Sequence, residues 1–462
     1  MIRTHHQQPT LWTGFLKEEI NDLWEPWMRA ADGLLDDEQL IEHIFEAQGR
    51  RWKNSRTRGR LQTPSEVVLR LLVLKHVRNW SYQSLERESR ANLVYRAFAR
   101  IGGEKVPDAK TMARLGQVIG PEVVASLHRR IVELAVEQKV VRGRKMRLDT
   151  TVVETNIHYP TDSSLLGDGA RVLTRIMKKV VSTIGGLKER VRDRMRSVRK
   201  KVVGVAIAAR RKGEAGEQQR RGLYKDLLSL SRKIVNQAGR VAQEVATLPK
   251  KTQAKVRGLV EQMEGMKERT KQVIRQTKAR IWEGQTKHPE KVVSLFEPHT
   301  EIIRKGKASK PTEFGKMVKI QEAENQIVTH YEVFEERPAD SDLLVDAVAK
   351  HQELLGRTPE VVAADAGFYS QANEKALEER GIPHVSIPNK NTKSEARRKH
   401  QKQRWFKNGQ RWRTGCEGRI SVLKRRHGLD RCLYPGLNGM KRWVGMGVIA
   451  DNLINIGLHL AV

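Results

Sequence analysis

The pattern of apolar and polar residues changes along the chain and predicts different elements in its different parts. Up to about residue 140, apolar residues recur at the spacing of short helices. One such helix is predicted at the sequence TPSE, residues 63–66, which offers a capping hydroxyl, a proline at the first helical position and a glutamate three residues after the cap. Further helix starts are predicted at Ser81, Leu93, Asp108 and Pro121. We therefore expect an all-α region over residues 1–140.

Strand signals begin near residue 146, where β-branched residues become frequent. The predicted strands are 146–157 (one strand or two adjacent ones), 316–321, 326–334, 360–364 and 384–387. The predicted helices are 343–355 with a cap near Asp340, 371–380 and 411–426. Strands first, followed by alternating helices and strands, indicate a mixed sheet flanked by helices. This α/β order fits a ribonuclease-H-like core.

A long basic segment interrupts that order. Residues 171–290 contain 32 Lys and Arg against 11 Asp and Glu, and their apolar residues recur at helical spacing. We expect a basic helical insertion over residues 165–300. It could be a solvated helical hairpin, but segments this basic more often lie along a polyanion.

The two ends of the chain bear on its location. The N-terminus lacks the apolar stretch of a signal peptide. The apolar C-terminal residues 444–462 are interrupted by Asp451, Asn452 and Asn455, which favours a buried core helix over a membrane span. Two cysteines offer no disulfide framework. We expect a cytoplasmic protein without a membrane partner.

Charge narrows the class of partner. The chain has 462 residues, with 87 Lys and Arg against 54 Asp and Glu, and a formal net charge of +33. Such a chain repels itself unless it meets a polyanion, and a phosphate backbone is the natural one. The alternative is a ribosome-associated or merely highly soluble basic protein, but these are usually much shorter. We therefore expect a nucleic acid as the partner.

Two aspartates stand where predicted strands give way to other residues. Asp149 precedes Thr150-Thr151 at the predicted end of a strand, and Asp365 ends the strand 360–364. Ligands of open α/β sheets gather outside such strand ends, and carboxylate oxygens suit Mg²⁺ or Mn²⁺. Taken singly, each aspartate is more often a turn former.

A third carboxylate lies on the predicted helix 411–426. Arg413, Glu417 and Lys424 fall at i, i+4 and i+11, close to one helical face. A glutamate between two cations could hold a metal ion with phosphates beside it. The alternative is a surface Arg–Glu pair that contributes a few tenths of a kcal/mol to stability.

Several segments together resemble one family. The spacing of Arg413, Glu417 and Lys424 is similar to the Tyr-Arg-Glu-Lys signature of bacterial insertion-sequence transposases of the DDE group. DTTVVETNIHYPTDSSLL resembles the region around their first catalytic aspartate, and ADAGFYSQAN the region around their second. TPSEVVLRLLVLKHVRNWSYQSLERE and VPDAKTMARL resemble their N-terminal helical domain. One departure is Gln410, which stands at the position of the signature's tyrosine.

The resemblance implies an activity and a site. Residues 1–140 would form a helical DNA-binding domain, and residues 141–462 a ribonuclease-H-like catalytic domain carrying the 165–300 insertion. Asp149, Asp365 and Glu417 would be the catalytic residues and would hold two Mg²⁺ or Mn²⁺ ions. The expected DNA contacts are Arg411, Trp412, Arg413, Arg419 and Lys424.

The implied reaction is cleavage of double-stranded DNA at the transposon ends, followed by strand transfer into target DNA. The acting form would be a homodimer on paired ends, and no ATP site is indicated because the chain lacks a phosphate-binding GxxxxGK[ST] motif. Two other functions are compatible with the same residues: a structure-selective nuclease on the same core, and a non-catalytic DNA-binding protein derived from a transposase.

Overall fold

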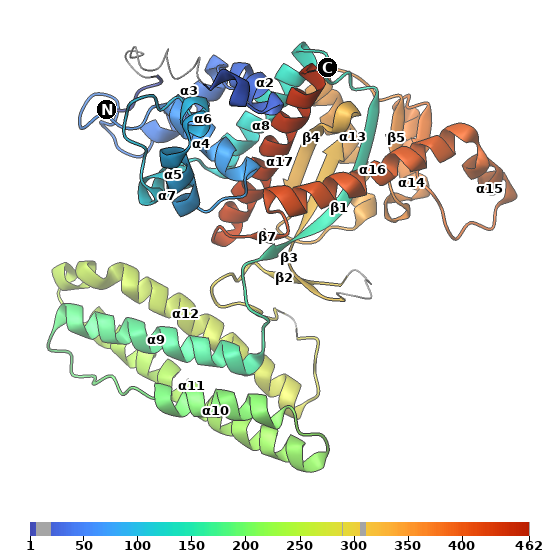
Figure 1. Cartoon of the computed structure of the whole chain (residues 1–462). Helices are drawn as coiled ribbons and strands as arrows, with labels where there is room; N and C mark the ends of the chain where they lie inside the picture. The colour runs from blue at the N-terminus through green and yellow to red at the C-terminus, as the bar shows by residue number, and fades with distance from the viewer. Residues whose placement is uncertain (6–19, 289, 305–310, 462) are drawn as a thin grey trace. The chain divides into compact units, whose positions relative to one another are not determined.

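The computed structural model describes residues 1–5, 20–288, 290–304 and 311–461. Contacts within the chain divide it into two compact units, residues 1–156 with 303–462, and residues 157–302. The first unit contains a mixed sheet together with the N-terminal helices, and the second is helical (Figure 1). The predicted mixed α/β class with an N-terminal helical region is confirmed. The assignment of DNA binding to residues 1–140 and of catalysis to residues 141–462 stays a prediction.

Short helices with clear start signals form the N-terminal part of the first unit. They are η1 (Asn21–Leu23), α2 (Pro26–Leu34), α3 (Glu38–Gly49), α4 (Ser65–Val77), α5 (Tyr82–Ala91), α6 (Leu93–Phe98), α7 (Ala109–Val118) and α8 (Pro121–Glu137). The Ser81 hydroxyl accepts a bond from the Ser84 N–H, and the Asp108 carboxylate accepts one from the Thr111 N–H, so both predicted caps are confirmed.

The predicted start at residues 63–66 is wrong by one residue. Helix α4 begins at Ser65, with Pro64 as its N-cap and no side-chain cap. Tertiary bonds explain the difference, because the Ser65 N–H and hydroxyl both donate to the Arg3 carbonyl, at 3.0 and 3.2 Å. The Arg3 carbonyl therefore accepts from the Ser65 N–H, a group at the helix start that would otherwise need a capping side chain as its acceptor.

The sheet is mixed, and its central strand is long. The strands are β1 (Lys145–Thr155), β2 (Glu301–Ile303), β3 (Glu313–Glu322), β4 (Val328–Val333), β5 (Val361–Ala363), β6 (His384–Ser386) and β7 (Arg431–Cys432). Their order is β2-β3-β1-β5-β6, with β4 also on β3 and β7 also on β1. β3 runs antiparallel to β1 and β4, whereas β5 runs parallel to β1 and β6.

The prediction that Asp149 ends a strand is wrong. Asp149 is the fifth residue of the eleven-residue strand β1, which continues to Thr155. The strand continues because the residues after Asp149 are mostly β-branched and pair with β3 as far as Glu154. Asp149 therefore lies inside the strand, paired with Ile320 of β3 and two residues beyond the last residue of β1 that pairs with β5.

Helices cover both faces of the sheet. They are η2 (Glu324–Gln326), η3 (Asp340–Leu343), α13 (Leu344–Leu355), η4 (Ala366–Phe368), α14 (Gln371–Glu379), α15 (Glu395–Lys402), α16 (Arg404–His427) and α17 (Gly436–Leu460). Val153 of β1 shares a core with α16 and α17, whereas Leu148 shares one with α13 and α14. Because side chains alternate along a strand, odd-numbered residues of β1 face α16.

The C-terminal helix α17 is buried, as the sequence predicts. Its polar residues have partners: Asp451 accepts a bond from Arg419 at 2.7 Å, and the Asn452 amide bonds both the N–H and the carbonyl of Val328 at 2.8 Å. Paired in this way, buried polar groups cost little. Among the described residues, no helix combines the length and apolar character that a membrane span requires.

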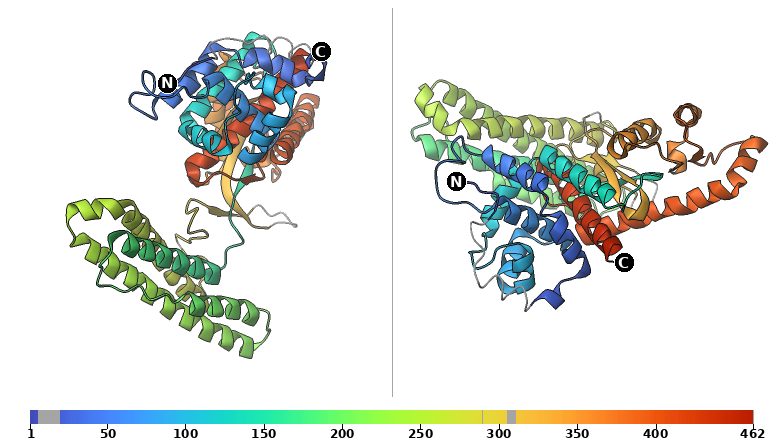
Figure 2. Two further views of the ribbon diagram at one scale, coloured as in Figure 1. Left: turned by 60° about the vertical axis from the view of Figure 1, so that its left-hand side comes forward. Right: turned by 90° about the horizontal axis from the view of Figure 1, so that it is seen from above.

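The second unit is built from four helices, α9 (Asp162–Ile184), α10 (Met195–Ala208), α11 (Glu214–Ala246) and α12 (Lys250–Trp282). They pack side by side, as the left view of Figure 2 shows. Their inward residues form one apolar core that includes Leu173, Val198, Leu227 and Val273. The apolar residues of 171–290 recur at helical spacing, so each helix has an apolar stripe. Burying these stripes against one another produces the bundle.

A buried histidine joins α8 to the sheet. His128 is 5% exposed, and its Nε2 lies 2.8 Å from the Val328 carbonyl of β4. Burial lowers the pKa of His128 to about 4, below its usual 6.5. Burial also lowers the pKa of His76, His330 and His351 in the same unit. Unfolding must therefore let neutral imidazoles take up protons at mildly acidic pH.

We predict a pH-dependent stability that traces to His128. Because its pKa is lower in the folded state, its contribution is fully present above pH 6.5 and is lost as pH falls toward 4. When the pH falls from 7 to 5, the protonation of this residue in the unfolded state should lower the free energy of unfolding by about 2 kcal/mol. Urea unfolding of the first unit at both pH values measures the loss, and His128→Gln should reduce it. The exposed His459→Gln serves as the control; an equal loss in all three proteins would contradict the assignment.

Candidate active site

The register of β1 and β5 relates the backbone positions of two aspartates. Arg147 pairs with Ala363 across these parallel strands, and Asp149 and Asp365 each stand two residues further along. Asp365 keeps an extended backbone (φ −78°, ψ 176°), caps η4 and accepts a bond from the Gly367 N–H at 2.8 Å. If this register is continued by two residues, the two aspartates lie at the same level of the sheet. Neighbouring strands run about 4.8 Å apart.

Helix α16 brings the third carboxylate to the same edge. Its Arg413 lies between Asp149 and Glu417: Nη1 is 4.0 Å from Asp149 Oδ2, and Nη2 donates to Glu417 Oε1 at 2.9 Å. The Asp149 side chain is 16% exposed and that of Glu417 is 57% exposed. One guanidinium therefore separates a fixed carboxylate from one that is free to change rotamer.

Arg147 fixes the distance between α16 and the sheet. It donates to the Glu322 carboxylate on β3 and, at 2.5 Å, to the Trp412 carbonyl on α16, and it lies 4.9 Å from the Trp412 ring. A side chain at Gly415 would collide with its guanidinium. Burial raises the pKa of Glu322 to about 7, although Arg147 opposes that shift. The helix can approach this closely only because Gly415 lacks a Cβ.

Gln410, at the tyrosine position of the signature, binds the ends of two strands. Its Nε2 donates to the Ala364 carbonyl at 3.2 Å, next to Asp365, and to the carbonyl and hydroxyl of Ser386 at the end of β6. The preceding Gly409 packs so closely that a Cβ would lie 2.6 Å from the Ser386 Cβ. In this chain the position thus supports the backbone that carries Asp365.

The other predicted DNA contacts on α16 differ in their surroundings. Arg411 is exposed, and Trp412 is half-buried against Arg147. Lys424 is half-buried two turns beyond Glu417. Arg419 is 7% exposed and donates to Asp451 and Gln326 in the core. Because its guanidinium is bound to these two side chains, Arg419 is not among the proposed DNA contacts.

A fourth acidic residue, Asp340, lies beside the site and was predicted only as a helix cap. It is the first residue of η3, whose N-cap is Ala339 and which has no side-chain cap. Its carboxylate instead accepts a bond from the Thr150 hydroxyl at 3.0 Å. A Cβ on Gly367 would lie 3.1 Å from Asp365 Oδ1 and 3.2 Å from Asp340 Oδ2, which puts both carboxylates beside that glycine. Sequence spacing carries no signal for this contact.

The donor atoms suit a hard divalent cation, but the present side-chain positions do not surround one. Asp149, Asp365 and Glu417 offer only carboxylate oxygens, the ligands that Mg²⁺ prefers. In the part of the chain that the structure describes, no three acidic, His or Cys side chains are grouped closely enough to hold an ion. Arg413 contributes to this, because its guanidinium lies between the carboxylates of Asp149 and Glu417.

One cavity of the first unit lies elsewhere. It has a volume of about 420 Å³ and is lined by residues of α8, β4, α13 and α17, none of them a predicted site residue. The charges on its wall are paired, Lys350 with Glu332 and Arg129 with Glu353, both at 3.1 Å.

Comparison with known families identifies two segments. Residues 25–117 match the family model described as "Transposase domain (DUF772)", and residues 291–453 match "Transposase DDE domain". No curated protein and no solved structure matches the chain. The second match includes Asp365 and Glu417, whereas Asp149 lies between the two matched segments.

The two matches cover helices α2 to α7 and the elements from β2 to most of α17, together more than half of the chain. They are separated by β1 and the four-helix unit. On these two matches, the chain belongs to the insertion-sequence transposases of the DDE group.

Proposed function

We propose that this protein binds the terminal inverted repeats of its mobile element, cleaves DNA there and joins the freed end to target DNA. The observation that carries the proposal is the register of β1 and β5, which sets Asp149 level with Asp365 under a helix bearing Glu417. The membership of a transposase family implies DNA as the partner. The specific steps, the residues that perform them and the homodimer on paired ends are part of the proposal.

The sheet supports a ribonuclease-H-like core. Three antiparallel strands, β1, β3 and β4, are followed by two parallel ones, β5 and β6, and helices connect the later strands. In open α/β sheets, ligands gather beyond the carboxyl ends of the parallel strands. Asp365 lies beyond the end of β5, which is where such a core would place its chemistry.

Asp149, Asp365 and Glu417 would hold two Mg²⁺ or Mn²⁺ ions. When bound, such ions lower the pKa of the attacking hydroxyl or water and stabilise the charge on the phosphoryl oxygens. Strand β1 and the turn after β5 would hold the two aspartates in place, and Glu417 would turn from Arg413 toward them. Arg413, released in that turn, would then contact phosphates of the transposon end, as would Lys424. Gln410 keeps the Ala364–Asp365 backbone in position.

The proposed reaction has two displacements at phosphorus. In the first, a water oxygen attacks and the bond to the 3′ oxygen at the element's end breaks, which frees a 3′-hydroxyl. In the second, that hydroxyl loses its proton, its oxygen attacks a target phosphate, and the bond from that phosphate to the target's own 3′ oxygen breaks. No covalent intermediate with a protein side chain is needed, so the protein contributes positioning and charge.

Helix α16 supplies that charge. Arg404–His427 contains eight Lys or Arg, and Glu417 is its only acidic residue. A lone glutamate on such a helix is not explained by charge balance at the surface, since Arg413 alone contacts it among the basic residues of α16. The proposed role accounts for both observations, because phosphates require the cations and a metal ion requires the carboxylate.

We predict that Asp149→Asn, Asp365→Asn and Glu417→Gln each abolish cleavage and leave binding of the terminal repeats within about twofold. Each change removes one anionic ligand while preserving shape, and losses of about 10²- to 10³-fold are usual when one group that stabilises transition-state charge is removed. A gel assay of 3′-end release in Mg²⁺, paired with fluorescence anisotropy for binding, measures both quantities.

The matched control is Glu379→Gln on α14, an exposed carboxylate paired with Lys375. It should cleave like the unaltered protein. Wild-type cleavage by any of the three site variants would remove that residue from the site. A protein that cleaves terminal-repeat DNA but never joins a pre-cut end to target DNA would be a nuclease on the same fold.

We predict that Arg413→Gln binds Mn²⁺ more tightly in the absence of DNA, by about fivefold, while strand transfer falls. The guanidinium competes with a divalent cation for Asp149 and Glu417, so its removal leaves both carboxylates to the ion. Electron paramagnetic resonance titration of Mn²⁺ gives the affinity without any turnover.

Arg413→Lys keeps the charge and is the control, with an affinity near that of the unaltered protein. Weaker Mn²⁺ binding by Arg413→Gln would show that the arginine helps to hold the ion and does not compete with it. The competition would then have to be dropped from the account.

A further inference from the structure

Helix α10 of the second unit is unusually basic. Residues 192–212, which contain α10, include nine Lys or Arg and one acidic residue, and α10 itself (Met195–Ala208) contains no Asp or Glu. Its helical neighbours each carry acidic residues along their length. The excess positive charge of this unit is therefore not evenly spread, and α10 has the least internal compensation.

The two faces of α10 have different compositions. Val198, Val205 and Ala208 are buried in the bundle, and Gly204 lies so close to Leu223 that a Cβ there would be 3.2 Å from it. The residues Arg196, Lys200, Val203 and Ile207 recur at i, i+4, i+7 and i+11, which is one stripe on the opposite side. We call the exposed residues Arg196, Arg199, Lys200, Val203, Ile207 and Arg210 the α10 face.

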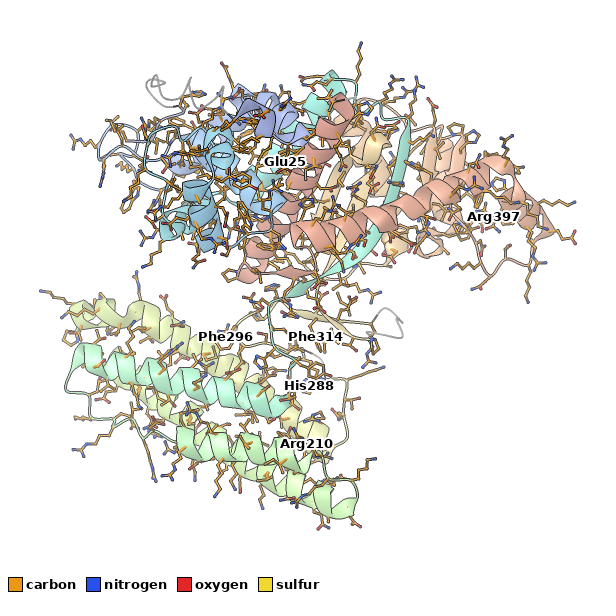
Figure 3. All side chains as sticks on the ribbon, in the orientation of Figure 1. Glu25, Arg210, His288, Phe296, Phe314 and Arg397 are labelled. Atoms are coloured by element: carbon orange, nitrogen blue, oxygen red, sulfur yellow. The ribbon has the colours of Figure 1, made fainter. Side chains whose placement is uncertain are left out.

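The apolar members of the α10 face are strongly exposed. Val203 is 57% exposed and Ile207 is 53% exposed, although both are β-branched residues that normally favour the interior. Arg210 follows the helix, and Figure 3 labels it at the end of α10. Exposed apolar residues between cations on one stripe are a feature of surfaces that bind a partner.

The cations of the α10 face lack the ion pairs found on the other helices. On α9, α11 and α12, the pairs Arg171–Asp168, Arg221–Glu217 and Lys267–Glu264 neutralise part of the charge. Among the described residues, Arg196, Arg199 and Lys200 make no ion pair, whereas Lys201, on the flank of α10, is paired with Asp226. Three neighbouring unpaired cations repel one another, and an external anion would relieve that repulsion.

We infer that the α10 face binds duplex DNA, with α10 lying in or along the major groove. A groove about 12 Å wide admits one α-helix, Arg and Lys side chains reach the phosphates on its rims, and the methyl groups of Val203 and Ile207 suit thymine methyls. The inference rests on the proposed function and deepens it, because it gives the four-helix unit a DNA contact of its own, apart from the carboxylates.

The test compares two triple variants of the full chain that lose the same charge. Arg196→Gln, Arg199→Gln and Lys200→Gln change the α10 face, whereas Lys251→Gln, Lys255→Gln and Lys278→Gln change exposed lysines of α12. Fluorescence anisotropy with a 30-base-pair duplex, from low to high NaCl, gives the slope of log Kd against log salt. Each lost phosphate contact lowers that slope by about 0.9.

Relative to the unaltered chain, we expect the slope of log Kd against log salt to fall by about 2 to 3 in the α10 variant and by less than 1 in the α12 variant. Equal slopes in the two variants would overturn the inference while leaving the proposed function intact, provided that the unaltered chain binds the duplex. Failure of the unaltered chain to bind any duplex would overturn both.

A second pair of measurements separates DNA from other occupants of the α10 face. Val203→Thr with Ile207→Thr keeps β-branching and removes apolar contact, so duplex affinity should fall severalfold at an unchanged salt slope. Binding of phosphatidylglycerol vesicles that the α10 triple variant abolishes, with its duplex binding unaltered, would assign the face to a membrane. Loss of self-association in ultracentrifugation, again with duplex binding unaltered, would assign it to a second copy. Either result would overturn the inference.

Discussion

The pairing of β1 with a neighbour on each side is the constraint on which the rest of the site depends. β3 holds β1 along eight residue pairs, and β5 joins it in parallel only at Lys145–Arg147. The first pairing holds β1 in place over most of its length, and the second sets the level of β5. Asp149 and Asp365 come from positions more than two hundred residues apart, and this double pairing alone brings them to one level. Everything that α16 contributes is added to that fixed pair.

Polar contacts fix the position of helix α16 on the sheet, and the position of Glu417 depends on them. Arg147 joins β1, β3 and α16 through Glu322 and the Trp412 carbonyl, while Gln410 joins α16 to the ends of β5 and β6. These bonds are largely buried, where breaking one leaves an unpaired polar group at a cost of about 1–3 kcal/mol. The carboxylate at residue 417 therefore stands on a helix whose position is set by two residues that do not themselves belong to the ligand set.

Arg413 places a positive charge between two carboxylates. Asp149 and Glu417 carry like charges near one another, and Arg413 lies between them. The same residue is expected to contact DNA, so one guanidinium would serve two successive purposes. In that account, binding of an ion and binding of DNA are linked, because the ion frees the arginine that the phosphate needs.

Much of the fold could be predicted from sequence because its signals are local. Capping residues such as Ser81 and Asp108, the apolar stripes of the basic segment and the β-branched run after residue 146 each act within a few residues. The contacts that could not be predicted are long-range. The Thr150–Asp340 bond, the Arg3 carbonyl that replaces a cap on α4, and the buried pair Arg419–Asp451 all join distant segments that no spacing rule connects.

The candidate site was partly predictable for the same reason. Arg413, Glu417 and Lys424 stand at helical spacing on one element, and Asp365 follows a short apolar strand. The sequence left open whether residues 146–157 form one strand or two, and only the continuous pairing of β1 with β3 places Asp149 inside a single strand. Nor could spacing reveal that Gln410 supports the backbone of Asp365, since that contact depends on how α16 crosses the sheet.

The most direct measurement of the central claim is the position of bound Mn²⁺ in crystals of the protein with a terminal-repeat duplex, located by anomalous diffraction. The account predicts density with carboxylate oxygens of Asp149, Asp365 and Glu417 at about 2.0–2.6 Å, with Arg413 turned toward a phosphate. Density that involves only one of these residues, with Arg413 still between Asp149 and Glu417 in the DNA-bound state, would contradict it.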